Sequence, residues 1–103
     1  MAANPSKQEN IMITFTSEKE WFEVGILRAN KRHHLKITVS EKTVLQMHLC
    51  DKETDKVYRR LDAPGAILMP GKEYNYNFIT NYESRLHMMP MTQATVECEV
   101  EEI

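Results

Sequence analysis

Residues 94–101 read ATVECEVE, so small or apolar side chains alternate with polar ones at every step. A period of two places the apolar members on one face of a strand and Thr95, Glu97 and Glu99 on the other. This pattern is typical of a half-buried strand in an antiparallel sheet, because one face packs on the core and the other meets water. The same alternation predicts further strands over residues 11–16, 35–39, 45–49 and 74–78.

Two other segments indicate strands with less regular patterns. Residues 21–28 are rich in side chains that favour sheets, and Gly25 among them predicts a bulge or a close approach of another chain segment. Residues 56–61 are short and polar, as an edge strand would be. No amphipathic pattern is long enough for a helix of about ten residues, so we expect helix in less than about a tenth of the chain.

Short strands separated by turn signals predict an all-β fold, namely an antiparallel β-sandwich or jelly roll of seven to eight strands. Two Pro-Gly pairs mark turns, because proline presets φ and glycine permits positive φ. Residues 82–92 are expected to form a long connection, in which the methionines of residues 88–91 either fill the core or form an adaptable recognition loop. We expect Phe15, Trp21 and Phe78 to lie in the core with the apolar alternating residues.

The chain has 103 residues and a mass of 12.1 kDa, which predicts a single β-sandwich domain over residues 11–103. Residues 1–10 are polar and aperiodic, so they are expected to form a flexible arm. They show no secretory signal, and Cys50 and Cys98 are too few for a disulfide scaffold, which together predict a cytoplasmic location. Free thiols are expected, although two cysteines alone leave a bridge open.

The charges fall into two groups. Residues 28–36 carry four basic residues and no acid, whereas residues 97–102 carry four glutamates and no basic residue. The formal net charge of −2 predicts no nucleic-acid partner. The basic segment is either a solvated hairpin or a surface for an acidic protein segment or anionic lipid headgroups. We expect the partner-binding turn to consist of Lys31, Arg32, His33 and His34.

No catalytic or metal-binding constellation is expected, and no cofactor. Glu97 and Glu99 flank Cys98, and their charges raise a thiol pKa. The four histidines lack the spacing of zinc ligands. Residues 51–55 carry three acids without the glycine of an EF-hand loop, so a calcium site of another type is left open. With three glycines the chain has no phosphate-binding loop, and the sequence predicts a protein that is not an enzyme.

Residues 71–84 form an aromatic-rich segment that ends in Phe78-Ile-Thr-Asn81, and the alternating residues 94–100 follow. This arrangement resembles the end of GOLD (Golgi dynamics) domains. The cysteine pair and transmembrane helix of luminal members are not recognisable, so the resemblance is to cytosolic members of lipid-transfer and Golgi adaptor proteins. It implies a β-sandwich that binds proteins, and in some members membranes, without catalysis.

We therefore expect a non-catalytic protein-interaction module of the adaptor or recruitment type. The alternative is a small ligand-binding or carbohydrate-binding jelly roll, in which tryptophan and tyrosine rings stack and asparagine amides form hydrogen bonds. A concave face beside an exposed tyrosine favours the ligand, and a flat edge favours the module. The predicted ligand or partner face consists of Tyr74, Asn75, Tyr76, Asn77, Asn81 and Tyr82.

Overall fold

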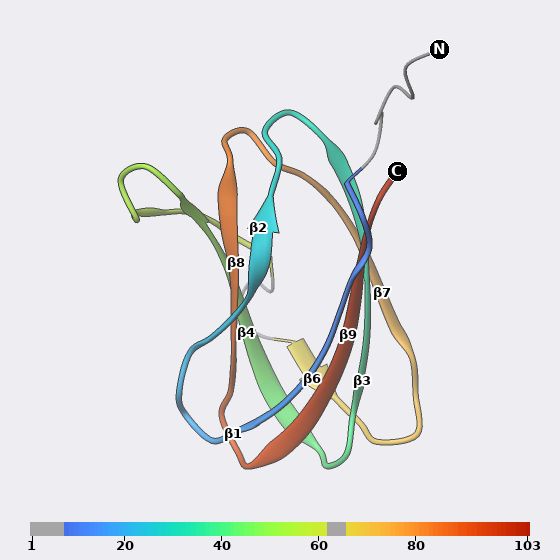
Figure 1. The fold of residues 1–103 in the computed structure, drawn as a ribbon. Helices are drawn as coiled ribbons and strands as arrows, with labels where there is room; N and C mark the ends of the chain where they lie inside the picture. Colours follow the sequence, from blue (N-terminus) through green and yellow to red (C-terminus); the bar gives the residue numbers. More distant parts are fainter. Residues whose placement is uncertain (1–7, 62–65) are drawn as a thin grey trace.

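The computed structural model describes residues 8–61 and 66–103, which form nine β-strands and no helix (Figure 1). The strands are β1 (Ile11–Ser17), β2 (Phe22–Leu27), β3 (Arg32–Val39), β4 (Thr43–Asp51), β5 (Val57–Arg60), β6 (Ala66–Leu68), β7 (Tyr74–Ile79), β8 (Ser84–Pro90) and β9 (Ala94–Glu102).

The strands form two antiparallel sheets that pack face to face. Sheet A has the order β1-β9-β3-β7. Sheet B has the order β2-β8-β4-β5, and β6 pairs with the other half of β4. Strands β1 to β4 alternate between the sheets, and β7 to β9 do so again, as in a jelly roll. The predicted all-β sandwich is confirmed, with β6 and β8 in addition to the predicted strands.

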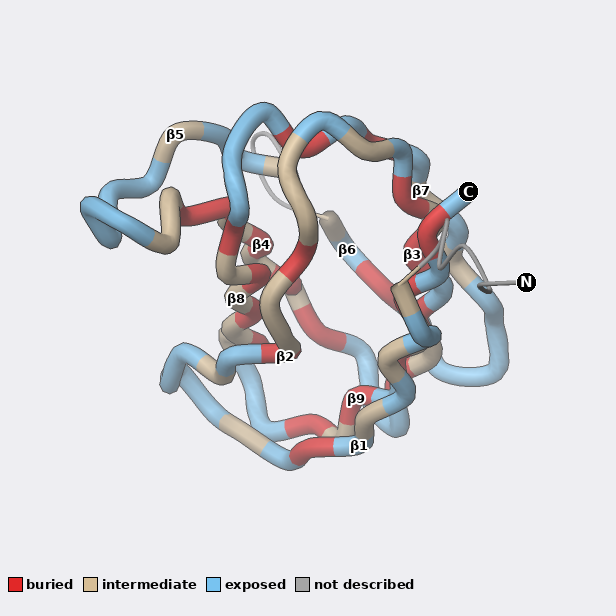
Figure 2. Tube along the Cα trace, turned by 45° about the horizontal axis from the view of Figure 1, so that its top comes forward, coloured by how far each residue is buried: buried red, intermediate tan, exposed pale blue. Residues whose placement is uncertain are grey.

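The core fills the space between the two sheets, and buried positions alternate with exposed ones along each strand (Figure 2). Phe15 and Phe78 are buried, as predicted. Trp21 is not in the core: it precedes β2, is 43% exposed, and packs on the outer face of sheet B against His48. Phe22 points inward instead and stacks on Phe15, because a one-residue shift along a strand moves a side chain to the other face.

The prediction of a long connection over residues 82–92 is wrong, because β8 lies within it and pairs with both β2 and β4. Met88 is fully buried there, and Met89 and Met91 are half-buried. The bulge predicted at Gly25 is confirmed by a register shift between β2 and β8. A Cβ atom on Gly25 would lie 2.7 Å from the Cδ1 atom of Ile11, so β1 and β2 approach closely at this position.

Two of the four basic residues, Arg32 and Lys36, lie in β3, and the four glutamates lie in the neighbouring strand β9. We expected the basic residues at a loop tip, but Arg32 begins β3, which pairs along its length with the acidic strand β9. Lys36 lies opposite Glu99, and its Nζ atom is 3.7 Å from the Oε1 atom of that carboxylate. Part of the basic charge therefore meets acids of the same sheet.

Cys50 lies in sheet B and Cys98 in sheet A, and both thiols are buried and free. Most of the predicted arm (residues 1–7) and the turn predicted at residues 62–65 lie outside the described residues. Gln8 is tied to the sandwich, because its backbone N–H donates to Glu102 (3.1 Å) and its side chain donates to the Ile26 carbonyl (2.7 Å).

Candidate functional site

β7 forms one edge of sheet A (Figure 1), and no other described strand pairs with its outer side. It carries no charged residue and no proline, and its register with β3 has no shift. Natural edge strands are usually protected by charges, proline or bulges. β5, one edge of sheet B, is protected in this way, because it is short, carries two arginines and pairs with β4 through a register shift. β7 is therefore open to pairing with an added strand.

The predicted ligand or partner face is divided, because residues that alternate along β7 point to opposite faces of sheet A. Asn75 and Asn77 are exposed on the outer face of sheet A, whereas Tyr74 and Tyr76 are half-buried and pack against the core. The Oδ1 atom of Asn75 lies 2.7 Å from the Nε2 atom of His34. β7 therefore does not bring its tyrosine rings and its asparagine amides together.

The other two residues of the predicted face lie in the turn after β7. Tyr82 is 51% exposed, and its ring meets that of Tyr58 edge-on at 5.0 Å. The backbone N–H of Asn81 donates to the Tyr58 hydroxyl (3.4 Å). Both residues therefore pack toward β5 of the opposite sheet.

A hollow of about 340 Å³ lies beside the last residues of β7. The Nη1 atom of Arg59, which comes from β5, donates to the carbonyl oxygen of Ile79 (3.2 Å). The backbone N–H of Ile103 donates to the carbonyl oxygen of Arg32 (2.9 Å). These two bonds bring residues of β3, β5 and β7 to one corner of the sandwich. We call this corner the two-arginine hollow; it is lined by Arg32, Arg59, Asn77, Phe78, Ile79 and Ile103.

The hollow combines positive charge with apolar surface. Arg32 and Arg59 are exposed, and Ile79 and Ile103 expose 45% and 59% of their surface. Guanidinium groups bind carboxylates through paired, charge-assisted hydrogen bonds. The site therefore suits a ligand that carries carboxylates next to apolar groups.

A hydrogen-bond network lies behind the hollow. The buried carboxylate of Glu102 accepts bonds from the Nε (2.9 Å) and Nη2 atoms of Arg28 and from the backbone of Gln8. Hydrogen bonding by Arg28 lowers the pKa of Glu102 to about 2, against the opposing effect of burial. The Thr80 hydroxyl donates to the Arg28 carbonyl (2.5 Å) and lies 3.3 Å from the Nε2 atom of His33.

His33 belongs to this network, and its predicted place in an exposed turn is wrong. It is completely buried, and its ring stacks on Phe78 at 5.3 Å. Burial lowers the pKa of His33, so the ring is neutral near pH 7 and adds no charge to the surface. Arg32 and His34 also lie in β3, and only Lys31 precedes the strand. Of the four predicted residues, Arg32 alone lines the hollow.

Arg59 is a site residue that the sequence did not indicate. The sequence placed residues 56–61 in an edge strand, and the Arg59-Arg60 pair was the available signal. Its proximity to Arg32 depends on the order of strands in both sheets, and periodicity does not determine that order.

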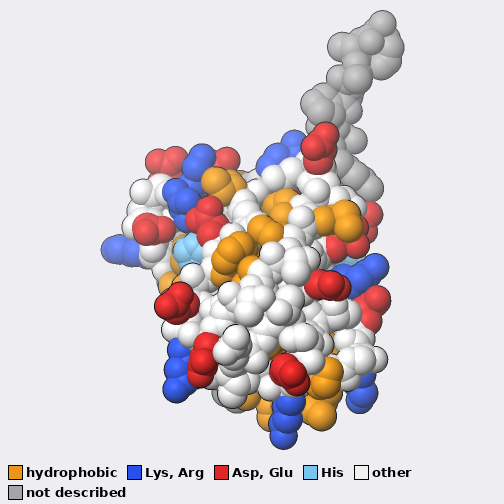
Figure 3. All heavy atoms as spheres, turned by 60° about the horizontal axis from the view of Figure 1, so that its bottom comes forward, with side chains coloured by type: hydrophobic (Ala, Val, Ile, Leu, Met, Phe, Trp, Pro, Cys, Tyr) orange, Lys and Arg blue, Asp and Glu red, His pale blue; other side chains and the backbone are white. Residues whose placement is uncertain are grey.

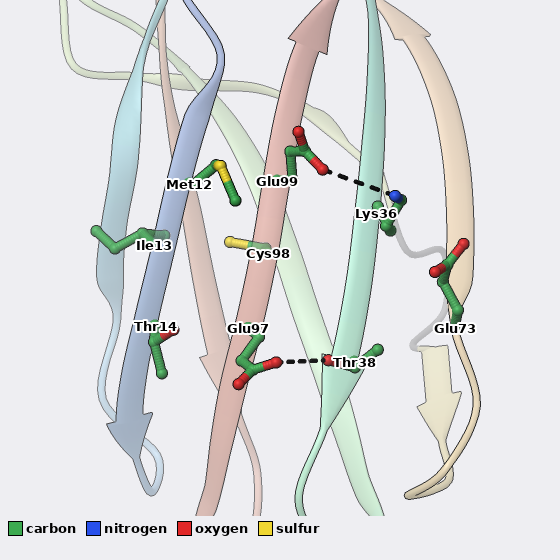
Figure 4. Close-up of a pocket in the computed structure, with 9 residues that line it drawn as sticks. All are labelled: Met12, Ile13, Thr14, Lys36, Thr38, Glu73, Glu97, Cys98 and Glu99. Carbon is green, nitrogen blue, oxygen red and sulfur yellow. Dashed lines mark hydrogen bonds and ion pairs between the residues drawn. The ribbon is translucent and has the colours of Figure 1, made fainter.

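A second hollow of about 490 Å³ lies on the outer face of sheet A (Figure 4). The Thr38 hydroxyl donates to Glu97 (3.3 Å), and Lys36 faces Glu99. Glu73 also lines this hollow, which gives it three carboxylates and one ammonium group. Its excess of negative charge makes it unsuitable for an acidic partner.

Cys50, His87 and Glu23 lie in the order of a thiol nucleophile, its base and an acid that orients the base, as in a thiol-dependent active site. The Sγ atom of Cys50 lies 3.4 Å from the Nδ1 atom of His87, whose Nε2 atom lies 3.4 Å from the Oε1 atom of Glu23. However, Cys50 is 3% exposed, and burial followed by the charge of Asp55 raises its pKa, so the thiol is protonated and shielded. Burial raises the pKa of Cys98 to about 12.

In the parts of the chain that the structure covers, no three His, Cys, Asp or Glu side chains are placed to hold a metal ion. Residues 8–61 and 66–103 likewise include no helix that is both long and apolar enough to cross a membrane. On the face drawn in Figure 3, acidic and basic side chains are interspersed, so no single sign of charge dominates it.

No protein-family model matches the chain, and no curated protein matches it. Among solved structures, the chain is similar to one described as "Bacillus endospore appendages form a novel family of disulfide-linked pili", with a TM-score of 0.59 and 9% identity over 99% of this chain and 93% of that one. This likeness shows a shared fold.

Two further structures are less similar. A de novo designed double-stranded β-helix has a TM-score of 0.45 and 14% identity, over 93% of this chain and 100% of that one. The infectious bursal disease virus Gx strain structure has a TM-score of 0.44 and 11% identity, over 98% of this chain and 36% of that one.

Proposed function

We propose that this chain is a non-catalytic protein-interaction module that binds an extended acidic segment of a partner protein by strand addition to β7. The observation that carries the proposal is the two-arginine hollow beside an uncharged edge strand with regular register. In strand addition, main-chain hydrogen bonds supply affinity, and pockets that take alternate side chains supply specificity.

The hollow matches the geometry of an added strand. Such a strand directs every second side chain to the outer face of sheet A, where Asn77 and Ile79 are exposed. A carboxylate on that face comes within reach of Arg32 or Arg59, and a neighbouring apolar side chain packs against Ile79 and Ile103. The hollow therefore selects acidic partners that also carry apolar side chains.

The absence of catalysis is part of this proposal, and the protonated, buried thiols support it. The cytoplasmic location stays a prediction from the sequence. The resemblance to GOLD domains also stays a prediction, because a β-sandwich fold is shared by many unrelated proteins.

A peptide of alternating valine and glutamate, roughly ten residues long and labelled with fluorescein, tests the proposal by fluorescence anisotropy. We expect saturable binding that weakens as salt rises above about 0.15 M, because the arginines are exposed and screened. The Arg32→Glu/Arg59→Glu variant should lose at least about tenfold in affinity, or about 1.4 kcal/mol. The matched control is Lys19→Glu/Lys42→Glu, which changes net charge equally beyond the far end of β3 and should bind as the wild type does.

A second peptide separates strand addition from charge attraction. It has the same sequence with every backbone amide N-methylated, so it keeps its charge but cannot donate main-chain hydrogen bonds. We expect it not to bind. Equal binding of both peptides would contradict strand addition. Binding to phosphatidylserine vesicles but to neither peptide would favour an anionic membrane as the partner.

A second candidate function is a subunit of a protein assembly. β1, the other edge of sheet A, also carries no charge, and its register with β9 has no shift. Pairing of β7 with β1 of a second copy is a head-to-tail contact, which forms rings or open filaments. The fold shared with a structure described as pili supports this candidate. Cys50 and Cys98 are buried, so this assembly would be held by strand pairing and not by disulfides between copies.

Sedimentation velocity without any peptide tests the assembly function. An assembly subunit should form a series of oligomers as its concentration rises. Proline in place of Asn75 should reduce them, because the N–H of Asn75 faces away from β3 and proline removes this donor from the free edge of β7. A single monomer at every concentration would contradict this candidate and leave the peptide-binding proposal unaffected.

A further inference from the structure

We propose that the outer face of sheet B carries a separate binding site for a neutral saccharide, built around Trp21. This site goes beyond the proposed function, because it lies on the other sheet and does not involve β7. We call it the Trp21 shelf; it consists of Trp21, Glu23, Gln46, His48 and His87.

The shelf is a row of polar side chains with an indole ring above one end. Glu23, His87 and His48 occupy paired positions on the adjacent strands β2, β8 and β4. Adjacent strands lie about 4.8 Å apart, so the row spans about 10 Å. Trp21 extends over it, because its ring lies 4.4 Å from that of His48 at an angle of 33°. With 43% of its surface exposed, Trp21 presents apolar ring surface to solvent beside this row.

Two polar side chains of the shelf, Glu23 and Gln46, are oriented and still have capacity to bind a ligand. The Oε1 atom of Glu23 accepts a bond from Arg85 (2.9 Å) and lies near His87, but its Oε2 atom has no partner among the described residues. Within residues 8–61 and 66–103, the Gln46 amide donates to the thioether of Met91 alone (3.6 Å), and a thioether is a weak acceptor. A carboxylate oxygen and an amide are therefore available to ligand hydroxyl groups.

This combination fits a pyranose ring better than a charged ligand. The C–H face of a sugar is apolar and packs on an aromatic ring, while its hydroxyl groups donate and accept hydrogen bonds at the rim. The Glu23 carboxylate is paired with Arg85, so the shelf carries little net charge to attract an ion. An apolar peptide would instead leave the carboxylate oxygen without a partner, which costs free energy.

Intrinsic fluorescence reports on this site directly, because Trp21 is the single tryptophan of the chain. The probes are cellotetraose, chitotetraose, mannotetraose and maltotetraose. We expect at least one to shift the emission saturably, with half-saturation between roughly 0.1 and 10 mM, as suits a small contact area. Glu23→Gln should weaken that binding at least about fivefold, because a charged acceptor forms the stronger hydrogen bonds. Glu20→Gln, an exposed acid outside the row, is the matched control and should not change it.

Two further results would support or overturn the proposal. Trp21→Ala should abolish the saccharide-induced NMR shifts of the Gln46 side-chain amide. It should lower the urea midpoint only slightly, since Trp21 lies outside the core and packs mainly on His48. The Arg32→Glu/Arg59→Glu variant should bind saccharide normally. The saccharide proposal can therefore be tested even if the peptide-binding proposal is wrong. No saturable response to any of the four saccharides, or equal binding by Glu23→Gln, would overturn the saccharide site. If the valine–glutamate peptide shifted the Trp21 emission and no saccharide did, Trp21 would belong to a protein-binding surface, and the saccharide site would be overturned.

Discussion

Glu102 connects three segments of the chain through one carboxylate. It lies at the end of β9, and it accepts hydrogen bonds from Arg28 after β2 and from Gln8 before β1. His33, opposite Glu102 in the register of β3 with β9, is neutral and fully buried. The corner of the sandwich that carries the two-arginine hollow therefore depends on one buried anion and one buried neutral ring.

Both groups make the protein less stable in acid. The pKa of His33 is lowered from 6.5, so its contribution to stability is complete above pH 6.5 and decreases as the pH falls below that value. The pKa of Glu102 is lowered from 4.5 to about 2, so its contribution is complete above about pH 4.5 and is lost as the pH falls toward 2. We expect the urea midpoint to fall in both ranges.

The Glu102→Gln variant isolates the second range. Its urea midpoint should be lower than that of the wild type at pH 7, because Arg28 loses its charged acceptor, and it should fall less between pH 4.5 and 2. Glu101→Gln, at the exposed neighbouring position, should retain the wild-type pH dependence. An equal decrease in the wild type and in Glu102→Gln would show that this carboxylate does not stabilise the fold.

The strands differ in how far the sequence predicts them. β9 and β3 have one buried and one polar face, so their alternation predicts both the strand and its orientation. β8 alternates as well, but methionines occupy both faces and Pro90 ends the strand, so its pattern is obscured. Trp21 has the hydrophobicity of a core residue, and only the position of β2 shows that its neighbour Phe22 points inward.

The candidate site was less predictable than the fold. Arg32 and Asn77 were among the predicted residues, whereas Arg59 was not. The alternation of residues indicates which face of a strand is polar. It does not specify that the β5 edge of sheet B lies beside the β7 edge of sheet A. The burial of His33 depends on the same long-range order, because β3 lies between β7 and β9.

At the scale of the whole molecule, the two sheets have edges of different kinds. The edges of sheet B are interrupted by the bulge at Gly25 in β2 and by the charges and register shift of β5, and its remaining edge strand, β6, is only three residues long. The edges of sheet A, β1 and β7, are regular and uncharged. Sheet A is therefore the sheet that can be extended, and only its β7 edge lies beside the two-arginine hollow.

Hydrogen exchange of the backbone amides of β7, with and without the valine–glutamate peptide, tests this account most directly. An added strand accepts hydrogen bonds from the outward-facing amides of β7, and amides in such bonds exchange slowly. We expect residues 74–79 to become protected at alternate positions, while residues 57–60 of β5 keep their exchange rates. Peptide binding that leaves the exchange of β7 unchanged would contradict strand addition at this edge.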